Sequence, residues 1–383
     1  MRVALFTNNY LPFRGGVTTA VETLRLGLER LRHPTRVFAP AACSPVADPP
    51  WVFRYPSMPA PTYPGFSLAL PFSRRVHAVM RAFAPDVVHA QHPFLLGPAA
   101  RRFARRLGRP LVFTYHTRYE KYAHYVPLPE RVVAALAVRL SCRFAVSSDL
   151  VIAPSERIAT TLRERGVAAP VAVVPTGVPL DHFSPDDRTT ARRKLGLPAD
   201  GLLCLYVGRL DREKSVDLII DAFGSIADAV SDARLSVIGQ GTHEVVLRRR
   251  AEASPARDRI HFHGGMAREM LPPHYQAADL FLFASETETQ GLVLAEAHAC
   301  ELPAVAVRAS GVDEVLHDGK TGILTKADVR EFADAAIGLL LDRERRLAMG
   351  HEARAVAARD FSASRQVDAM AAHYARLVER TTG

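Results

Sequence analysis

Two glutamates are candidate ligand-binding residues, because ionised carboxylates can hold a molecule that carries many hydroxyl groups. Glu288 and Glu296 are separated by seven residues and follow the short apolar run 280–283. That run predicts a buried strand, and the pattern from Leu292 onward predicts a helix, so Glu288 falls in the turn and Glu296 in the helix. At this spacing they cannot act as an adjacent acid/base pair on one atom. They suit sugar hydroxyls, since each carboxylate accepts two or more hydrogen bonds, although glutamates near a helix start often only complement its dipole.

Two cations could complement such a site by binding a diphosphate. Arg209 and Lys214 follow the apolar run 202–207, a second predicted strand, and precede a helix expected around 218–223. Exposed cations in a loop are common. In this context, however, both can converge with the N-terminus of a helix, where backbone N–H groups favour an anion.

The first half of the chain offers a histidine and a pair of glycines. His116 ends the predicted strand 111–115, where a buried structural histidine is the ordinary alternative to a site residue. Gly15 and Gly16 precede a helix expected from Thr19, and glycines let backbone approach a ligand closely, although a plain tight turn is also possible. Other histidines lack acidic or cysteine partners at ligand spacing, so no metal site is predicted.

The elements that position these residues alternate between apolar strands and amphipathic helices. Such alternation is typical of a doubly wound α/β sheet, in which ligands bind at the carboxyl ends of the strands. At 383 residues the chain is long enough for two such domains. The four cysteines are far apart in sequence and suggest neither a zinc site nor a disulfide framework.

The stretch 288–296, with Glu-Thr-Gln-Gly at its start, resembles the donor-sugar motif of retaining GT-B glycosyltransferases of family 4 (glycosyl transferases group 1). Its amino-acid sequence most resembles that of the bacterial diacylglycerol glucosyltransferase branch. A second match is 116–122, which resembles the His-Thr-x-Tyr-Glu-x-Tyr segment of that branch. A third is 208–215, which resembles the family's Gly-Arg-x4-Lys-Gly signature except that Ser215 replaces the glycine.

The resemblance implies an α/β fold of the GT-B type, with two Rossmann-like domains that face each other across a cleft. The expected organisation is an N-terminal acceptor-binding, membrane-facing domain (1–178), a C-terminal nucleotide-sugar domain (179–360), and a terminal helix (361–383) that crosses back. The hinge is placed at Pro175–Val178, where Pro179 replaces the family's acidic residue.

The resemblance also implies roles for individual residues. Four are expected to be catalytic: His116, Arg209, Lys214 and Glu288. The expected donor-binding positions are Gly15, Gly16, Gly239, Gly241, Gly264, Thr289, Gln290, Gly291, Leu292 and Glu296. Glu288 would orient the sugar hydroxyls, Glu296 would bind the ribose, and the two cations would neutralise the departing diphosphate. The resemblance implies neither a metal ion nor another cofactor, and we expect no covalent enzyme intermediate.

Charge is distributed unevenly along the chain. Residues 1–178 contain 23 Lys and Arg against 9 Asp and Glu, whereas the whole chain has a net charge of +9. A basic half indicates a polyanionic partner, such as an anionic membrane surface or a nucleic acid, unless the arginines only cover exposed helix faces. The stretch 72–83 predicts a basic amphipathic helix that could dock on a membrane, and 101–107 is a second candidate. The expected acceptor or membrane contacts are Tyr119, Glu120, Tyr122, Arg74, Arg75 and Arg81.

Together these observations predict a retaining enzyme that transfers a hexose, with glucose as the expected sugar, from a nucleotide-sugar donor to a membrane lipid such as diacylglycerol. No apolar run is as long as a membrane span, so we expect a cytoplasmic protein peripheral to the inner face of the cell membrane. A soluble acceptor, such as a sugar phosphate or polysaccharide precursor, is the main alternative. A nucleotide-sugar epimerase is a remote one. Nucleic-acid binding is disfavoured, because no aromatic platform or recognition helix accompanies the arginines. The nucleotide base, the sugar, the linkage position and the oligomeric state stay open.

Overall fold

The computed structural model describes residues 1–43, 47–61, 63 and 65–382. The chain forms two compact units. Unit 1 comprises 1–177 together with 363–383, and unit 2 comprises 178–362. The sequence-based boundaries, at 178/179 and 360/361, differ from these by at most two residues.

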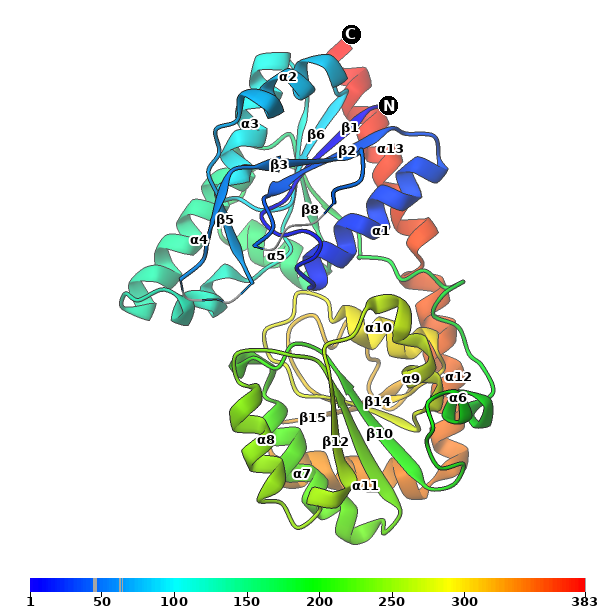
Figure 1. The fold of residues 1–383 in the computed structure, drawn as a ribbon. Coiled ribbons are helices and arrows are strands. Elements are labelled where there is room, and N and C mark those ends of the chain that lie inside the picture. Colours follow the sequence, from blue (N-terminus) through cyan, green and yellow to red (C-terminus); the bar gives the residue numbers. More distant parts are fainter. Residues whose placement is uncertain (44–46, 62, 64, 383) are drawn as a thin grey trace. The chain divides into compact units, whose positions relative to one another are not determined.

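Unit 1 contains a seven-stranded parallel sheet (Figure 1). Its strands, in spatial order, are β3 (Val52–Tyr55), β2 (Thr35–Pro40), β1 (Val3–Phe6), β6 (Val87–Ala90), β7 (Leu111–Thr114), β8 (Leu150–Ala153) and β9 (Val171–Val173). The central strands are buried on both faces, which explains why they are continuously apolar rather than alternating. The chain order reverses between β1 and β6, and such a reversal is where doubly wound sheets bind ligands.

Two helical layers cover this sheet. Helices α1 (Gly16–Arg30) and α13 (Ala363–Thr382) lie side by side on one face (Figure 1). On the other lie α2 (Arg74–Phe83), α3 (Leu96–Leu107), α4 (Glu130–Val146) and α5 (Glu156–Glu164). Alternate residues of β1 enter the two cores, with Leu5 on the α1 side and Phe6 on the other. Gly27 permits the close approach of α1 to α13, since a Cβ there would lie 2.2 Å from Val367 Cγ2.

Unit 2 contains a six-stranded parallel sheet. Its strands, in spatial order, are β12 (Ile260–Gly264), β11 (Ala233–Ile238), β10 (Leu202–Val207), β13 (Leu280–Phe283), β14 (Ala304–Val307) and β15 (Gly322–Thr325). The helices are α6 (Arg188–Lys194), α7 (Val216–Ala229), α8 (Glu244–Glu252), α9 (Pro272–Ala277), α10 (Leu292–Ala299), α11 (Val329–Leu341) and α12 (Arg343–Asp360). Here the chain order reverses between β10 and β13, the two strands that precede Arg209 and Glu288.

Two local predictions differ from the structure. The first helix begins at Gly16 rather than near Thr19, and Gly15 occupies its N-cap without a side-chain cap. The proline-rich stretch 45–71 was expected to be a long surface excursion, but it supplies the edge strand β3 and the small antiparallel pair β4 (Ser57–Pro59) and β5 (Ser67–Ala69). Proline is compatible with edge strands, because their outer N–H groups need no partner. Pro45 and Pro64 lie outside the described residues.

Candidate active site

A charged cluster lies at the topological switch point of unit 2, where the loops after β10 and β13 meet. Lys214 Nζ donates a hydrogen bond of 2.6 Å to Glu288 Oε1, and both side chains are largely buried. The structure thus joins two of the four expected catalytic residues, which are 74 positions apart in sequence. They lie at the sheet edge where a doubly wound fold binds its ligand.

The electrostatics of this pair favour two charged groups. Burial raises the pKa of Glu288, but the charge and hydrogen bond of Lys214, with smaller contributions from Ser285 and Arg209, outweigh it, so the pKa of Glu288 lies below its ordinary value. Glu288 is therefore ionised at neutral pH. Removing Lys214 would leave a poorly solvated carboxylate without its counter-ion.

Arg209, the third expected catalytic residue of this unit, is held by two carboxylates that the sequence analysis did not single out. Arg209 Nη2 donates to Glu213 Oε1 at 2.9 Å, and Arg209 Nη1 forms an ion pair with the buried Asp211. Asp211 also accepts from Thr242 N at 2.8 Å and Thr242 Oγ1 at 2.9 Å. It therefore ties the β10 loop to the β11 loop. Both acids lie between the two cations in the stretch 208–215, so their positions were visible in the sequence.

Ser215, the one departure from the signature in this loop, keeps a backbone conformation that is typical of glycine. It has left-handed backbone angles, φ 48° and ψ 41°, and serves as the N-cap of α7. Glycine adopts these angles without steric cost, whereas other residues pay about 1–2 kcal/mol. The loop keeps the glycine-type conformation despite the serine.

The glycines of the β11 loop are required by the packing of protein backbone. A Cβ on Gly239 would lie 1.8 Å from the carbonyl oxygen of Gly208, and one on Gly241 would lie 2.4 Å from the backbone of Leu210. Gly264 has φ +72° and open space where its Cβ would be. Packing alone accounts for the first two glycines, and donor contacts at all three stay predictions.

The segment 289–292 leads into α10, and Gly291 is its N-cap at φ 79°. Gln290 is buried, and the loop after β14 packs directly on this segment. A Cβ on Gly311 would lie 2.5 Å from the carbonyl carbon of Thr289. Gly311 therefore positions the donor-motif backbone. The loops of four neighbouring strands, β11, β10, β13 and β14, are linked in this way. Donor contacts by Thr289, Gln290, Gly291 and Leu292 stay predictions.

Glu296 is buried inside unit 2, and its hydrogen-bond partners differ from those of the Lys214–Glu288 pair. Its carboxylate accepts from Arg268 Nε at 2.8 Å and from Tyr275 OH at 3.2 Å, and the residue is only 3% exposed. Both partners come from the region between β12 and β13, which the sequence analysis passed over. Binding of ribose by Glu296 stays a prediction.

A second polar cluster lies at the switch point of unit 1, and it is built from histidines and amides. His116 Nε2 lies 2.7 Å from Gln91 Oε1, and Asn8 N donates to His92 Nδ1 at 3.1 Å. His89 is deeper, between Thr114 Oγ1 and Tyr374 OH, each at 2.7 Å. These residues join the ends of β1, β6 and β7 to α13.

Burial keeps the histidines of this cluster neutral. It lowers the pKa of His116 to about 4. Burial, together with the charge of His116, lowers the pKa of both His89 and His92 to about 3. An imidazole that is neutral at pH 7 can donate from one nitrogen and accept at the other. The Gln91 contact at His116 Nε2 makes that nitrogen the donor, because an amide oxygen can only accept.

The remaining candidates in unit 1 have structural partners. Glu120 is paired with Arg165 at 2.8 Å and with Arg118 at 3.6 Å. Tyr119 packs edge-on against Phe94 and Tyr115, and Tyr122 stacks with Tyr125. At the start of α1, Gly15 is extended, and a Cβ on Gly16 would meet no atom of the described residues within 4 Å. The backbone therefore does not demand either glycine, and their donor contacts stay predictions.

Membrane docking through the apolar face of α2 is a wrong prediction. Val76, Met80 and Phe83 are buried in the unit 1 core, so the apolar face within the helix is already covered by protein. Phe72, which precedes the helix, is the exception and is 73% exposed. Arg74, Arg75 and Arg81 lie on the solvent side, apart from any apolar stripe of their own helix. The second candidate, 101–107, forms part of α3, and its Phe103 is likewise buried.

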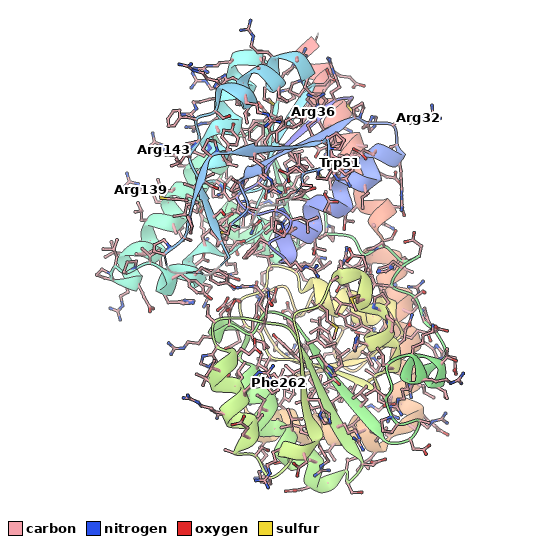
Figure 2. All side chains as sticks on the ribbon, in the orientation of Figure 1. Arg32, Arg36, Trp51, Arg139, Arg143 and Phe262 are labelled. Atoms are coloured by element: carbon pink, nitrogen blue, oxygen red, sulfur yellow. The ribbon has the colours of Figure 1, made fainter. Side chains whose placement is uncertain are left out.

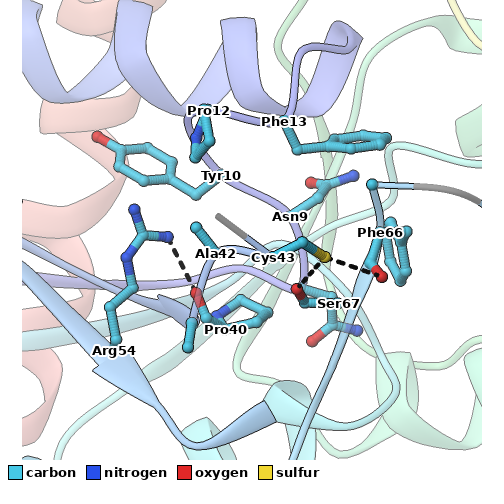
Figure 3. Close-up of a pocket in the computed structure, with 13 residues that line it drawn as sticks. Asn9, Tyr10, Pro12, Phe13, Pro40, Ala42, Cys43, Arg54, Phe66 and Ser67 are labelled. Atoms are coloured by element: carbon cyan, nitrogen blue, oxygen red, sulfur yellow. Dashed lines mark hydrogen bonds between the residues drawn. The ribbon is translucent and has the colours of Figure 1, made fainter. Parts of the chain in front are cut away.

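Figure 3 shows a small pocket of unit 1, between the loop after β1 and the ends of β2 and β5. Tyr10, Phe13 and Phe66 contribute rings, and Cys43 Sγ lies 3.1 Å from Ser67 Oγ. Its volume is about 30 Å³. By the same measure one water molecule needs about 10–15 Å³, so the pocket has room for only a few water molecules, and we assign no ligand to it.

Comparison with known proteins extends over both units. Residues 14–182 match the family described as Glycosyltransferase Family 4, and residues 187–356 match Glycosyl transferases group 1. The alpha-monoglucosyldiacylglycerol synthase of Acholeplasma laidlawii is 31% identical over 336 residues, which cover 84% of each chain. The D-inositol 3-phosphate glycosyltransferase of Xylanimonas cellulosilytica is 33% identical, over 96% of this chain and 93% of the relative.

Among solved structures, the sucrose-phosphate synthase of Thermosynechococcus elongatus superposes with a TM-score of 0.81 at 21% identity. The match covers 99% of this chain and all of that chain. This likeness shows the fold, two parallel-sheet Rossmann-like domains of the GT-B type. The family matches and the relatives show that the chain is a hexosyltransferase, and that it belongs to the family 4 glycosyltransferases of group 1.

Proposed function

We propose that this enzyme transfers glucose from a nucleotide-sugar donor to a membrane lipid such as diacylglycerol, with retention of anomeric configuration, and so forms an α-glycosidic glycolipid. Unit 2 would bind the donor and unit 1 the acceptor. The observation that supports the donor chemistry most strongly is the buried Lys214–Glu288 pair at the switch point of unit 2.

The reaction needs a stabilised diphosphate leaving group while positive charge develops on the sugar carbon. Lys214 and Arg209 would stabilise the negative charge, aided by the backbone N–H groups at the start of α7. Three carboxylates, Glu288, Asp211 and Glu213, hold these cations in position before the donor arrives. Such preorganisation reduces the reorganisation needed during the reaction.

Glu288 and His116 would act on the sugar rather than on the phosphate. An ionised Glu288 can accept hydrogen bonds from sugar hydroxyls, which orients the ring and favours the developing positive charge. His116 is neutral, so it would contribute hydrogen bonds without opposing that charge. We propose no covalent intermediate and no metal requirement. A chelator should leave the activity unchanged, and a trapped glycosylated carboxylate would contradict the first point.

The lipid acceptor is supported by the Acholeplasma laidlawii relative, whose name states a glucosyl-diacylglycerol product, and by the basic character of residues 1–178. No helix among the described residues is both long and apolar enough to cross a bilayer. We propose that the enzyme acts as a peripheral protein on the inner face of the cell membrane.

Product analysis by mass spectrometry tests this function. The enzyme is incubated with UDP-glucose, UDP-galactose and GDP-mannose, together with diacylglycerol in vesicles that contain phosphatidylglycerol, and Glu288→Ala serves as the control. A hexosyl-lipid that only the wild-type protein makes would support the proposal. Donor turnover without a lipid product would discard the lipid acceptor and keep the transferase.

A soluble acceptor is the second candidate, because the Xylanimonas cellulosilytica relative acts, by its name, on D-inositol 3-phosphate. It is tested in the same assay by replacing the vesicles with inositol phosphates and hexose phosphates. A glycosylated product in that arm, with none in the lipid arm, would favour this alternative.

A further inference from the structure

The outward face of α4 carries a row of exposed aliphatic side chains. Val132, Leu136 and Leu140 follow one another at intervals of four residues and are 62%, 52% and 41% exposed. Leu128, just before the helix, is 63% exposed. Because residues four apart lie on the same side of a helix, these side chains form one continuous apolar stripe.

A row of arginines runs beside this stripe. Arg131, Arg139 and Arg143 are exposed and spaced by multiples of four, and Figure 2 shows the last two on α4. Between residues 121 and 148, the sequence has a single acid, Glu130. We call Leu128, Val132, Leu136 and Leu140, with the three arginines, the α4 face.

The helix cannot turn this stripe inward, because its opposite side already packs in the core. Phe144 is buried edge-on against Phe113, with ring centroids 5.0 Å apart, and Ser141 and Ala145 are fully buried beside it. α2 has the opposite arrangement, with its apolar residues buried and its arginines in solvent. The exposed apolar surface is thus a property of α4 and not of every basic helix in unit 1.

We propose that the α4 face docks unit 1 onto an anionic lipid surface. Aliphatic side chains flanked by arginines on one helix match an interface in which the former enter the acyl boundary and the latter meet lipid phosphates. The arginine row favours anionic lipid over a neutral apolar partner by charge complementarity. This inference deepens the proposed function, since it names the surface that would bring the enzyme to a lipid acceptor.

Cosedimentation of the full chain with vesicles tests the proposal. The vesicles contain equal parts of phosphatidylglycerol and phosphatidylcholine, without diacylglycerol or donor, so the assay is independent of catalysis. Leu136→Glu with Leu140→Glu should reduce the partition coefficient at least about tenfold. Arg139→Glu with Arg143→Glu should reduce it about tenfold at low salt, and the difference from wild type should shrink at high salt.

Two matched control variants test whether the loss of vesicle binding is specific to the α4 face. Arg74→Glu with Arg75→Glu reverses the same charge on α2, and Val245→Glu with Val246→Glu places the same acids on an exposed apolar pair of unit 2. Each should change the partition by about threefold or less, since neither pair lies on the α4 face. Circular dichroism melting confirms that each variant is folded at the assay temperature.

The inference would be overturned if both α4 variants bound vesicles as strongly as the wild type, or if the α2 control lost as much vesicle binding as the α4 variants. The inference would also be overturned if the wild-type protein did not bind vesicles and light scattering showed a dimer that Leu136→Glu with Leu140→Glu abolishes. The α4 face would then contact a second copy of the chain. Vesicle binding through α4 without any hexosyl-lipid in the product assay would instead remove the proposed acceptor and leave the docking surface intact.

Discussion

The two units place polar clusters at equivalent points of their sheets, but they control charge in opposite ways. In unit 2, Lys214 and Glu288 are both charged, and each is stabilised by the other. In unit 1, the histidines around His116 are neutral, because burial removes their charge. A buried charged pair is prepared for an ionic ligand, whereas a neutral imidazole suits hydrogen bonding to an uncharged group. This difference agrees with the proposed roles of Lys214 on the charged diphosphate and of His116 on the uncharged sugar.

Removal of one charge from the unit 2 cluster should have the largest effect. Lys214→Ala leaves the Glu288 carboxylate without its counter-ion and removes a cation from the diphosphate. We expect kcat to fall by about 10²- to 10³-fold, as for other losses of electrostatic stabilisation. The control is Arg212→Ala, an exposed cation of the same short turn, which should retain activity within about twofold. Equal losses in both variants would contradict a specific role for Lys214.

Introducing a charge into the unit 1 cluster is the converse experiment. Gln91→Glu would place a carboxylate next to His116 Nε2 and raise the pKa of His116 by about 1–3 units. Wild-type kcat/KM should show no titration of this histidine between pH 6 and 8, since its pKa is about 4. The pKa of His116 in the variant would be about 5–7, so kcat/KM should be about 2- to 100-fold lower at pH 5 than at pH 8. Gln91→Asn is the neutral control, and a flat profile for Gln91→Glu would show that the charge of His116 is irrelevant.

The neutral histidines also predict sensitivity to acid. The pKa of His116 is lowered from 6.5 to about 4, so the unfolded chain binds more protons between these values. The free energy of unfolding is therefore not reduced by this histidine above pH 6.5. Below that pH it decreases toward pH 4, by about 1.4 kcal/mol per pH unit for each such histidine. The apparent Tm should fall between pH 6.5 and 5, and it should fall less in His116→Asn. An identical fall in both proteins would exclude His116 as a cause.

The packing of the donor motif can be perturbed without touching a charge. Gly311→Ala forces a Cβ against Thr289 at a left-handed backbone position, so we expect a loss of about 1–3 kcal/mol in stability and a several-fold higher KM for the donor. Gly319→Ala has the same backbone strain, φ +73°, with open space for its Cβ. It should lose only about 1 kcal/mol and bind donor normally. The same KM in both variants would mean that Gly311 does not position the motif.

The smallest expected effect concerns Ser215. Ser215→Gly removes the cost of a left-handed serine but adds entropy to the unfolded chain, so we expect a net gain of about 0.5 kcal/mol or less. Chemical denaturation measures the change. A clear loss of stability would show that the serine side chain makes a favourable interaction that outweighs the strain.

The sequence was sufficient for the parallel sheets and for the positions of the charged motif, because continuous apolar strands and the loops after them are local signals. It was insufficient where contacts join distant segments. The proximity of Gln91 to His116 follows from the adjacency of β6 and β7, and nothing in either stretch indicates it. Periodicity also identified α2 as amphipathic correctly, but it could not show which side faces the core. In α4 both sides are apolar, so the exposed stripe became visible only when Phe144 was seen to be buried.

A double-mutant cycle between Lys214 and Glu288 tests the central claim most directly. The rate of nucleoside diphosphate release is measured for the wild type, Lys214→Met, Glu288→Gln and the double variant, with the donor that the product assay identifies. Because Glu288 holds Lys214 in position in addition to its proposed role on the sugar, the double variant should lose clearly less activity than the product of the two single losses. Additive losses would contradict the account, because they would mean that the two residues act independently.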